Sequence, residues 1–235
     1  KRYFYRFETA GVTTRVGRTK TAPAEGADVP LLFAVVSCQD FIGRYYHSYR
    51  ALLDEKLDLD FVLHLGDYVY ETVNDNRFQS AGGAHQIVLP DGVDVSPAGD
   101  NSRIAAGTLA DYRTLYKTIR SDETLKEVHR LYPFIITWDD HEFANDCWQD
   151  HSTYFDEKAP KTGNFTDEKN TERRQVASRA WFEYQPAEVK FNVGATFPND
   201  ITIYRTLRFG KHVELFMTDQ RMYRDDHVVP EGPIN

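Results

Sequence analysis

The stretch from Phe61 to Glu71, FVLHLGDYVYE, constrains the fold of this chain more than any other. Its apolar start at Phe61–Leu63 predicts a buried strand, of the kind that a parallel sheet makes when helices cover both of its faces. Gly66 ends the strand, because a residue without a Cβ lets the backbone turn sharply. We therefore expect Asp67 at the carboxyl edge of the sheet, where open α/β sheets bind their ligands.

Tyr70 follows Asp67 by three residues on the same predicted loop. A carboxylate and a phenol at this spacing can converge on a hard, oxygen-seeking cation. In a simpler interpretation, Asp67 caps the next helix and Tyr70 only packs against its neighbours. This stretch alone leaves both interpretations open.

Composition narrows the class of protein. The chain is 41% apolar and 27% charged, which is enough for a substantial core. Its formal net charge of −8 disfavours a nucleic-acid partner. Two cysteines, Cys38 and Cys147, are too few for a disulfide scaffold, and whether they are bridged is left open. No 18-residue apolar run occurs, so we expect no transmembrane segment.

The region before Phe61 predicts a strand, a helix and the strand that leads to Asp67. Leu31–Ser37 is the first strand, which its apolar run predicts to be buried, and Arg44–Leu53 is the helix. A strand–helix–strand unit of this length makes two parallel strands with a right-handed crossover. Cys38 comes directly after the first strand, so we expect Cys38 and Asp67 at the same edge of the sheet.

The chain divides into three parts. Residues 1–21 alternate aromatic and polar side chains and predict two strands, Lys1–Phe7 and Thr13–Thr21, at the end of a preceding β domain. Residues 22–30 contain Pro and Gly and read as a linker. Residues 31–235 form the main domain. Because there is no initiator Met and no closing element, we expect a piece of a longer protein.

The remaining sequence alternates polar stretches with regular elements. The polar stretches are residues 72–107 and 150–170, and Ile87–Val95 suggests a hairpin around Asp91-Gly92. The expected helices are 108–118, 121–130 and 171–184, and the expected strands are 132–137, 201–208 and 212–217.

The strand at 132–137 ends in a third polar cluster. This cluster contains Asp139, Asp140 and His141, with Asn145 just beyond, and one of the two aspartates is expected to cap a helix beginning near Glu142. Three such clusters at one sheet edge would bring together a thiolate, carboxylates, a phenolate, an amide and an imidazole. That set suits a polynuclear metal centre. Thiolate and phenolate suit a trivalent or borderline transition metal, and Asp and Asn oxygens suit Ca²⁺ or Mg²⁺.

Other interpretations use fewer of these residues. Cys38 could be the nucleophile of a cysteine hydrolase with His141 as its base. The chain could also be a non-catalytic, calcium-stabilised binding module. Arg221, just beyond the last predicted strand, is a candidate phosphate clamp, because a forked guanidinium pairs with two phosphate oxygens.

Four motifs in order resemble the alkaline phosphatase D (PhoD-like) family of metallophosphoesterases. They are SCQ at Ser37–Gln39, HLGDYVYE at His64–Glu71, WDDHE with a following Asn at Trp138–Asn145, and DQRMYRD at Asp219–Asp225. The first residues also resemble the last strand of that family's N-terminal immunoglobulin-like domain.

The resemblance implies an α/β (α+β) fold, a four-layer αββα metallophosphoesterase sandwich that is incomplete in these residues. It also implies an Fe³⁺ ion with Ca²⁺ beside it. The implied activity is hydrolysis of phosphodiesters and phosphomonoesters by attack of a metal-activated water or hydroxide. The implied location is secreted, periplasmic or in the cell envelope.

The family's site residues carry over by position. Cys38 and Tyr70 would bind iron, Asp67 would bridge iron and calcium, and Asn145 would bind calcium. Asp140 falls at a ligand position of the wider superfamily, and His141 would face the scissile phosphate. The family's last metal motif, an Asp-x-His beyond Asp219–Asp225, does not occur in these residues. The remaining part of the same polypeptide is therefore the expected partner that completes the site.

Overall fold

A parallel sheet lies at the centre of the protein. The computed structural model describes residues 1–235 except 77–78, 81, 97–102, 154–168 and 227–235. The described sheet has the order β10–β6–β5, with both neighbouring pairs parallel. Its strands are β10 (Phe134–Ile136), β6 (Phe61–His64) and β5 (Phe33–Val36). The predicted parallel pairing of the strands that lead to Cys38 and Asp67 is confirmed.

The two strands of this pair differ in burial. All of β6 is buried, as the sequence predicts for a central strand. For β5 the same prediction is wrong, because Val35 is 54% exposed. The reason is its place in the sheet: β5 has one paired neighbour in the described part of the chain, and its outward face is only partly covered.

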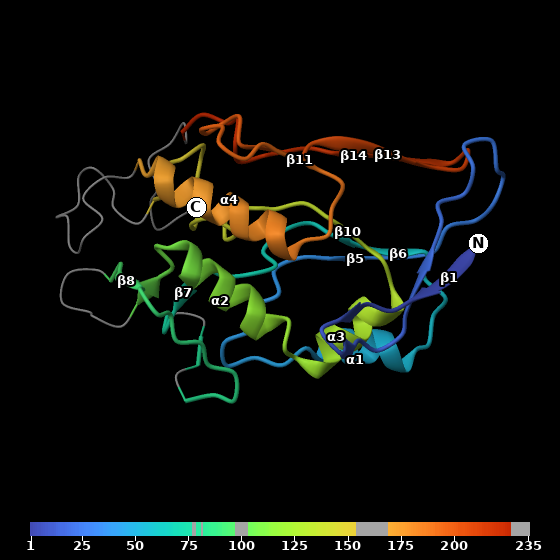
Figure 1. The fold of residues 1–235 in the computed structure, drawn as a ribbon, viewed down its shortest axis with the longest axis horizontal. Coiled ribbons are helices and arrows are strands. Elements are labelled where there is room, and N and C mark those ends of the chain that lie inside the picture. The colour runs from blue at the N-terminus through green and yellow to red at the C-terminus, as the bar shows by residue number, and fades with distance from the viewer. Residues whose placement is uncertain (77–78, 81, 97–102, 154–168, 227–235) are drawn as a thin grey trace.

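Helices α1 (His47–Asp54) and α3 (Glu123–Leu131) lie on one side of the sheet (Figure 1). They bury Tyr49, Leu125 and Val128 in the main apolar core. The predicted helix at 44–53 begins three residues later than expected. The preceding segment stays irregular because Gly43 has a φ of +68°, while Phe41 and Ile42 are drawn into the core.

A β-hairpin covers the other side of the sheet (Figure 1). It consists of β13 (Arg205–Phe209) and β14 (Val213–Met217), joined at Gly210-Lys211, so the predicted hairpin is confirmed. A second apolar cluster lies between hairpin and sheet, with Phe61, Leu63 and Met217 buried in it. The described layers are therefore helices, sheet and hairpin. The predicted strand at 201–208 is interrupted: β12 (Ile201–Thr202) pairs instead with β11 (Lys190–Phe191).

Helices α2 (Leu109–Ile119) and α4 (Thr171–Tyr184) pack against each other. Both predictions are confirmed, and both helices begin at a polar cap. The Thr108 side chain accepts from the backbone N–H of Asp111 in a capping box, and the Asn170 side chain accepts from that of Arg173. These caps satisfy backbone N–H groups that the first helical turn leaves without partners.

A small antiparallel sheet of three two-residue strands forms within the predicted loop at 72–107. Its strands are β7 (Thr72–Val73), β9 (Ile104–Ala105) and β8 (Val93–Asp94), in that order. The predicted hairpin at 87–95 is wrong, because β8 pairs with β9 rather than with residues before Asp91. The carboxylate of Asp111 accepts a hydrogen bond from the backbone N–H of Asp91, and this contact ties the segment before β8 to the start of α2. Most of the other predicted loop, 150–170, lies outside the described residues.

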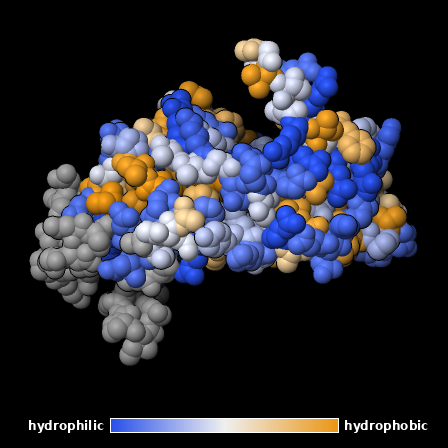
Figure 2. Space-filling model, turned by 90° about the horizontal axis from the view of Figure 1, so that it is seen from below, coloured by the Kyte–Doolittle hydropathy of each residue, from blue (hydrophilic) through white to orange (hydrophobic). Residues whose placement is uncertain are grey.

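The first residues form two short ladders. Strand β1 (Arg2–Tyr5) pairs with β4 (Gly17–Lys20), and β2 (Glu8–Thr9) pairs with β3 (Val12–Thr13). The face shown in Figure 2 is mostly hydrophilic, with apolar side chains in small groups. Among the described helices, none has the length and apolar character that crossing a bilayer requires.

Candidate metal centre

The tips of β5 and β6 are tied together by backbone hydrogen bonds. The N–H of Cys38 donates to the carbonyl of Gly66 at 3.1 Å, and the N–H of Gln39 donates to that of Asp67 at 3.0 Å. The predicted placement of Cys38 and Asp67 at one edge is confirmed. Both residues have left-handed backbone, with φ of +56° and +55°. Such conformations are costly for residues other than Gly and concentrate at functional sites.

Two side chains converge on one carboxylate oxygen of Asp67. The Cys38 Sγ lies 3.3 Å and the Tyr70 hydroxyl 3.4 Å from Asp67 Oδ2. Residues 68–71, which come directly after Asp67, form no helix, so the capping interpretation of Asp67 is wrong. On the other side, ligand atoms of Asp67, Asp140 and His141 lie within 4.8 Å of one another. Donors from all three strand tips therefore meet at one place.

The predicted helix near Glu142 is wrong. Residues 141–146 form turns, in which the Asp140 carbonyl accepts from the N–H groups of Phe143 and Ala144. The Asp140 side chain accepts from the N–H of Asp146, at 2.6 Å, whose φ is +49°. A helix does not form because this left-handed residue reverses the chain and because the Glu142 side chain is turned inward.

Glu142 is a residue that sequence reasoning missed. Its carboxylate is 2% exposed and accepts hydrogen bonds from three backbone N–H groups: those of Asp67 (3.1 Å), Tyr68 (2.7 Å) and Asp139 (2.8 Å). It therefore links the tip of β6 to the tip of β10. The sequence signal was its place in the WDDHE motif, and a helix beginning there would have turned its side chain to solvent.

Glu71 is the second missed residue. It is fully buried, and its two oxygens accept from His141 Nδ1 at 2.7 Å and from the N–H of Asn145 at 2.8 Å. Because Nδ1 is engaged by Glu71, Nε2 is the nitrogen with which His141 can serve the cavity that it lines. The Asn145 side chain donates to Asp146 at 3.3 Å, next to the turn that carries Asp140. The signal was the final acid of HLGDYVYE.

Arg221 lies beside the carboxylates of the third strand tip. Its Nε donates to Asp139 at 2.7 Å, and its Nη2 lies 3.5 Å from Asp140. A further contact joins Nη1 to the carbonyl of Cys147 at 3.4 Å. These contacts of the Arg221 guanidinium hold Asp139 and Asp140 in place. The phosphate-clamp role of Arg221 stays a prediction.

The acidic groups of this centre have raised pKa values. Burial, together with Asp140 and Asp139, raises the pKa of Asp67 to about 6 although His141 opposes the shift. Burial and Asp67 raise the pKa of Glu142 to about 8 against the backbone N–H groups it accepts from. Burial also raises the pKa of Cys38 and of Tyr70. Carboxylates packed this closely favour a cation among them.

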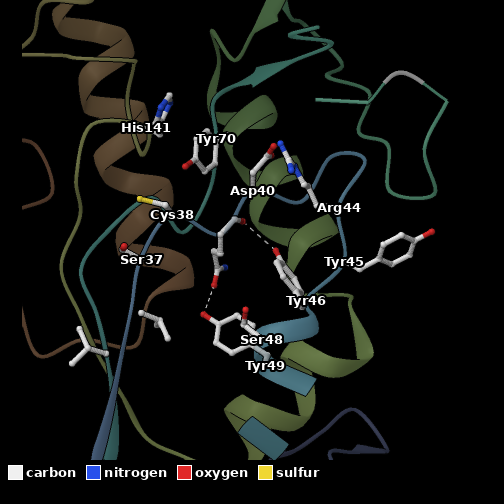
Figure 3. A pocket seen from close by; sticks show the side chains of 13 residues that line it. Ser37, Cys38, Asp40, Arg44, Tyr45, Tyr46, Ser48, Tyr49, Tyr70 and His141 are labelled. Carbon is white, nitrogen blue, oxygen red and sulfur yellow. Dashed lines mark hydrogen bonds between the residues drawn. The ribbon is translucent and has the colours of Figure 1, made fainter. Parts of the chain in front are cut away.

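The pKa of His141 is also raised, but for a histidine this shift favours the charged form. Burial disfavours its cation, but the Glu71 carboxylate outweighs that effect, and the pKa of His141 rises to about 10. His141, Cys38 and Tyr70 line a cavity of about 770 Å³ (Figure 3). Figure 3 also shows Asp40 and Arg44 side by side near Tyr70, with Tyr46 and Tyr49 further along the wall. A cavity of this volume is large enough for a small-molecule ligand.

Parallel strand tips, a cavity and a converging set of thiol, phenol, carboxylate and imidazole donors define an α/β protein with a candidate metal centre. The chain belongs to the PhoD-like phosphatase family, whose model matches residues 33–234. It is similar to alkaline phosphatase D of Bacillus subtilis (strain 168), with 35% identity over 235 residues. The aligned region covers 99% of this chain and 35% of the Bacillus subtilis protein.

A solved structure gives the same result. The chain is similar to one described as the structure of PhoD, with a TM-score of 0.72 and 32% sequence identity. The similarity covers 99% of this chain and 39% of that one. The predicted family and its mixed α/β fold are confirmed. The chain spans about a third of the length of the curated relative that it matches.

The Glu71–His141 contact yields a testable expectation. In a Glu71→Gln variant, His141 loses the carboxylate that orients its ring and supports its charge. If His141 acts as an acid–base group in phosphoester hydrolysis, as the motif predicts, the turnover number on a chromogenic phosphodiester should fall by roughly 10²-fold, the lower end for losing such a group. KM should change much less, because Glu71 does not line the cavity. Steady-state kinetics measure both. Glu183→Gln, which alters a peripheral carboxylate paired with Arg113, is the control. Unchanged turnover in Glu71→Gln contradicts the expectation.

Proposed function

We propose that the protein is a metal-dependent phosphoesterase that hydrolyses phosphodiesters and phosphomonoesters. The observation that carries the proposal is the convergence of Cys38 and Tyr70 on one oxygen of Asp67, with His141 facing the same cavity. Membership of the PhoD-like phosphatase family supports the reaction class.

The donor set fits two kinds of cation. Cys38 and Tyr70 offer a thiolate and a phenolate, which suit Fe³⁺, and Asp67 stands between them and the oxygen donors. Asp140 and Asn145 offer carboxylate and amide oxygens, which suit Ca²⁺. Bound there, the cations would neutralise the phosphate and supply an activated water or hydroxide for attack at phosphorus.

The chain's own residues have separate tasks in this proposal. Asp67 holds the two halves of the centre at a fixed separation. His141 presents Nε2 to the leaving oxygen, and its raised pKa, due to Glu71, keeps a proton available for that oxygen. Arg221 fixes Asp139 and Asp140 through its guanidinium, or clamps the phosphate if those contacts open.

The proposal extends to the whole protein. The described layers would be part of a four-layer αββα sandwich formed by residues 31–235 together with the remaining polypeptide, which would complete the metal site. Residues 1–21 would end an immunoglobulin-like domain, and residues 22–30 would link it to the catalytic domain. The protein would work outside the cytoplasm, in a secreted, periplasmic or cell-envelope location.

Metal removal tests the proposal against a cysteine hydrolase. Dialysis against a chelator should abolish phosphodiesterase activity, and returning Fe³⁺ and Ca²⁺ should restore it. A thiol enzyme would survive chelation and be killed by alkylation of Cys38. The raised pKa of Cys38 argues against an activated thiolate, which needs a lowered one. A calcium-stabilised binding module would turn over no chromogenic phosphodiester under any metal supplement.

The intact protein is expected to be coloured. A phenol has an unperturbed pKa of about 10, and burial raises that of Tyr70, so only a highly charged cation would ionise it near neutral pH. A phenolate on Fe³⁺ absorbs visible light. The measurement is the visible spectrum of the wild type beside Tyr70→Phe, with Tyr45→Phe as control, since Tyr45 lines the same cavity but is more than half exposed. An active, colourless wild type, or an unchanged Tyr70→Phe spectrum, contradicts the iron assignment.

A further inference from the structure

Glu142 is a buried carboxylate with an unusual set of partners. Its Oε2 accepts from the N–H groups of Asp67 and Asp139, and its Oε1 accepts from that of Tyr68. Among the described residues no Lys or Arg forms an ion pair with it. Backbone N–H groups alone therefore hold a carboxylate that is 2% exposed. The contacts with Tyr68 and Asp139, at 2.7 and 2.8 Å, are short for N–H···O hydrogen bonds and therefore fix their donors firmly.

The three donors belong to two segments that are far apart in sequence. Asp67 and Tyr68 follow β6, and Asp139 follows β10. The bond to the N–H of Asp67 holds a residue whose φ is +55°, a conformation that its surroundings must enforce. The bond to Asp139 fixes the residue next to Asp140. The Glu142 side chain thus sets the distance between the segment after β6, which carries Asp67, and the segment after β10, which carries Asp140.

The surroundings of Glu142 favour the same role. It lies among the acids Asp67, Asp139 and Asp140, of which Arg221 pairs with the last two, and His141 lies beside the first. Acid groups still outnumber basic groups in this cluster, which favours a cation placed among them. Glu142 itself does not line the cavity, because its two oxygens are turned to the backbone.

We propose that Glu142 is the positioning residue of the metal centre: it holds the strand tips of β6 and β10 at the separation that cation binding requires, without itself being a ligand. This inference rests on the proposed metal centre. Replacing a residue that orients metal ligands in this way typically lowers metal affinity by roughly 10- to 100-fold.

The chain offers a matched control for this proposal. Asp111 is also fully buried, and its carboxylate also accepts from three backbone N–H groups, those of Asp91, Gly107 and Thr108. It lies at the start of α2, outside the metal centre. Glu142→Gln and Asp111→Asn therefore make the same chemical change to the same kind of contact, one beside the candidate ligands and one away from them.

The experiment measures cation binding rather than activity. The chelator-treated intact protein and both variants are titrated with Ca²⁺, and separately with Tb³⁺, by calorimetry, and their thermal unfolding is followed by circular dichroism. Both variants should unfold at lower temperature. Only Glu142→Gln should bind the cations more weakly, by about tenfold or more. Equal affinity in Glu142→Gln and the wild type overturns the proposal.

A second variant covers the case in which Glu142→Gln does not fold. Glu142→Asp keeps the charge but is one methylene shorter and cannot reach all three N–H groups. It should also bind Ca²⁺ and Tb³⁺ about tenfold more weakly. Wild-type affinity in Glu142→Asp shows that charge alone suffices and overturns the positioning role. A wild type that binds neither cation removes the metal centre itself, a different outcome from a variant that binds as well as the wild type.

Discussion

The Asp67→Asn variant is expected to lose phosphodiesterase activity by at least about 10³-fold while remaining folded. The change removes the carboxylate on which Cys38 and Tyr70 converge and leaves an amide of nearly the same shape. If Asp67 bridges two cations, both sites lose a charged ligand, and several kcal/mol of transition-state stabilisation are lost with them. Initial rates on bis(p-nitrophenyl) phosphate, together with metal content, measure the effect.

The fold should tolerate this change. Asn adopts left-handed backbone more readily than most residues, so the φ of +55° at position 67 adds little strain. Asp200→Asn is the control, because Asp200 is 3% exposed and lines a separate pocket beside α4 that contains none of the candidate ligands. That variant should keep its activity and metal. If Asp67→Asn retains most of the wild-type turnover, Asp67 bridges nothing and the proposed centre is wrong.

The second large effect is expected for Gly66→Ala. A Cβ at this position would lie 2.2 Å from the backbone nitrogen of Asp139 and 2.6 Å from the carbonyl carbon of Trp138. The φ of Gly66 is also +111°, which side chains rarely allow. Because backbone atoms cannot yield as a side chain can, the tips of β6 and β10 must separate. We expect the free energy of unfolding to fall by about 4 kcal/mol, or the protein not to fold.

Gly194→Ala separates the clash from the backbone strain. Gly194 has a φ of +94°, but a Cβ there would meet nothing within 4 Å. Its replacement should cost only the strain, about 1–2 kcal/mol. Urea unfolding followed by circular dichroism measures both variants. Equal losses in the two variants would show that the approach of the strand tips is not what requires glycine at position 66.

The identity of most candidate ligands follows from local sequence. The apolar run at Phe61–Leu63 and the glycine after it fix where β6 ends, and the same reasoning places Cys38 after β5. Parallel strands end at one edge, so the order of strand and polar cluster along the chain was enough to bring Cys38 and Asp67 together. Tyr70 follows the end of β6 by a few residues, and Asp140 and His141 follow the end of β10 in the same way.

The contacts that fix these residues were decided by the tertiary structure. Glu71 and Glu142 each contact residues 70 or more positions away in the sequence, and their motif positions alone do not show which groups they contact. The turn at 141–146 replaced a helix for the same reason, since its inward-facing glutamate is satisfied only by strand tips that approach in space. The sequence by itself determined which residues reach the edge of the sheet. Only packing decided their separation, because it depends on how closely β6 and β10 meet at Gly66.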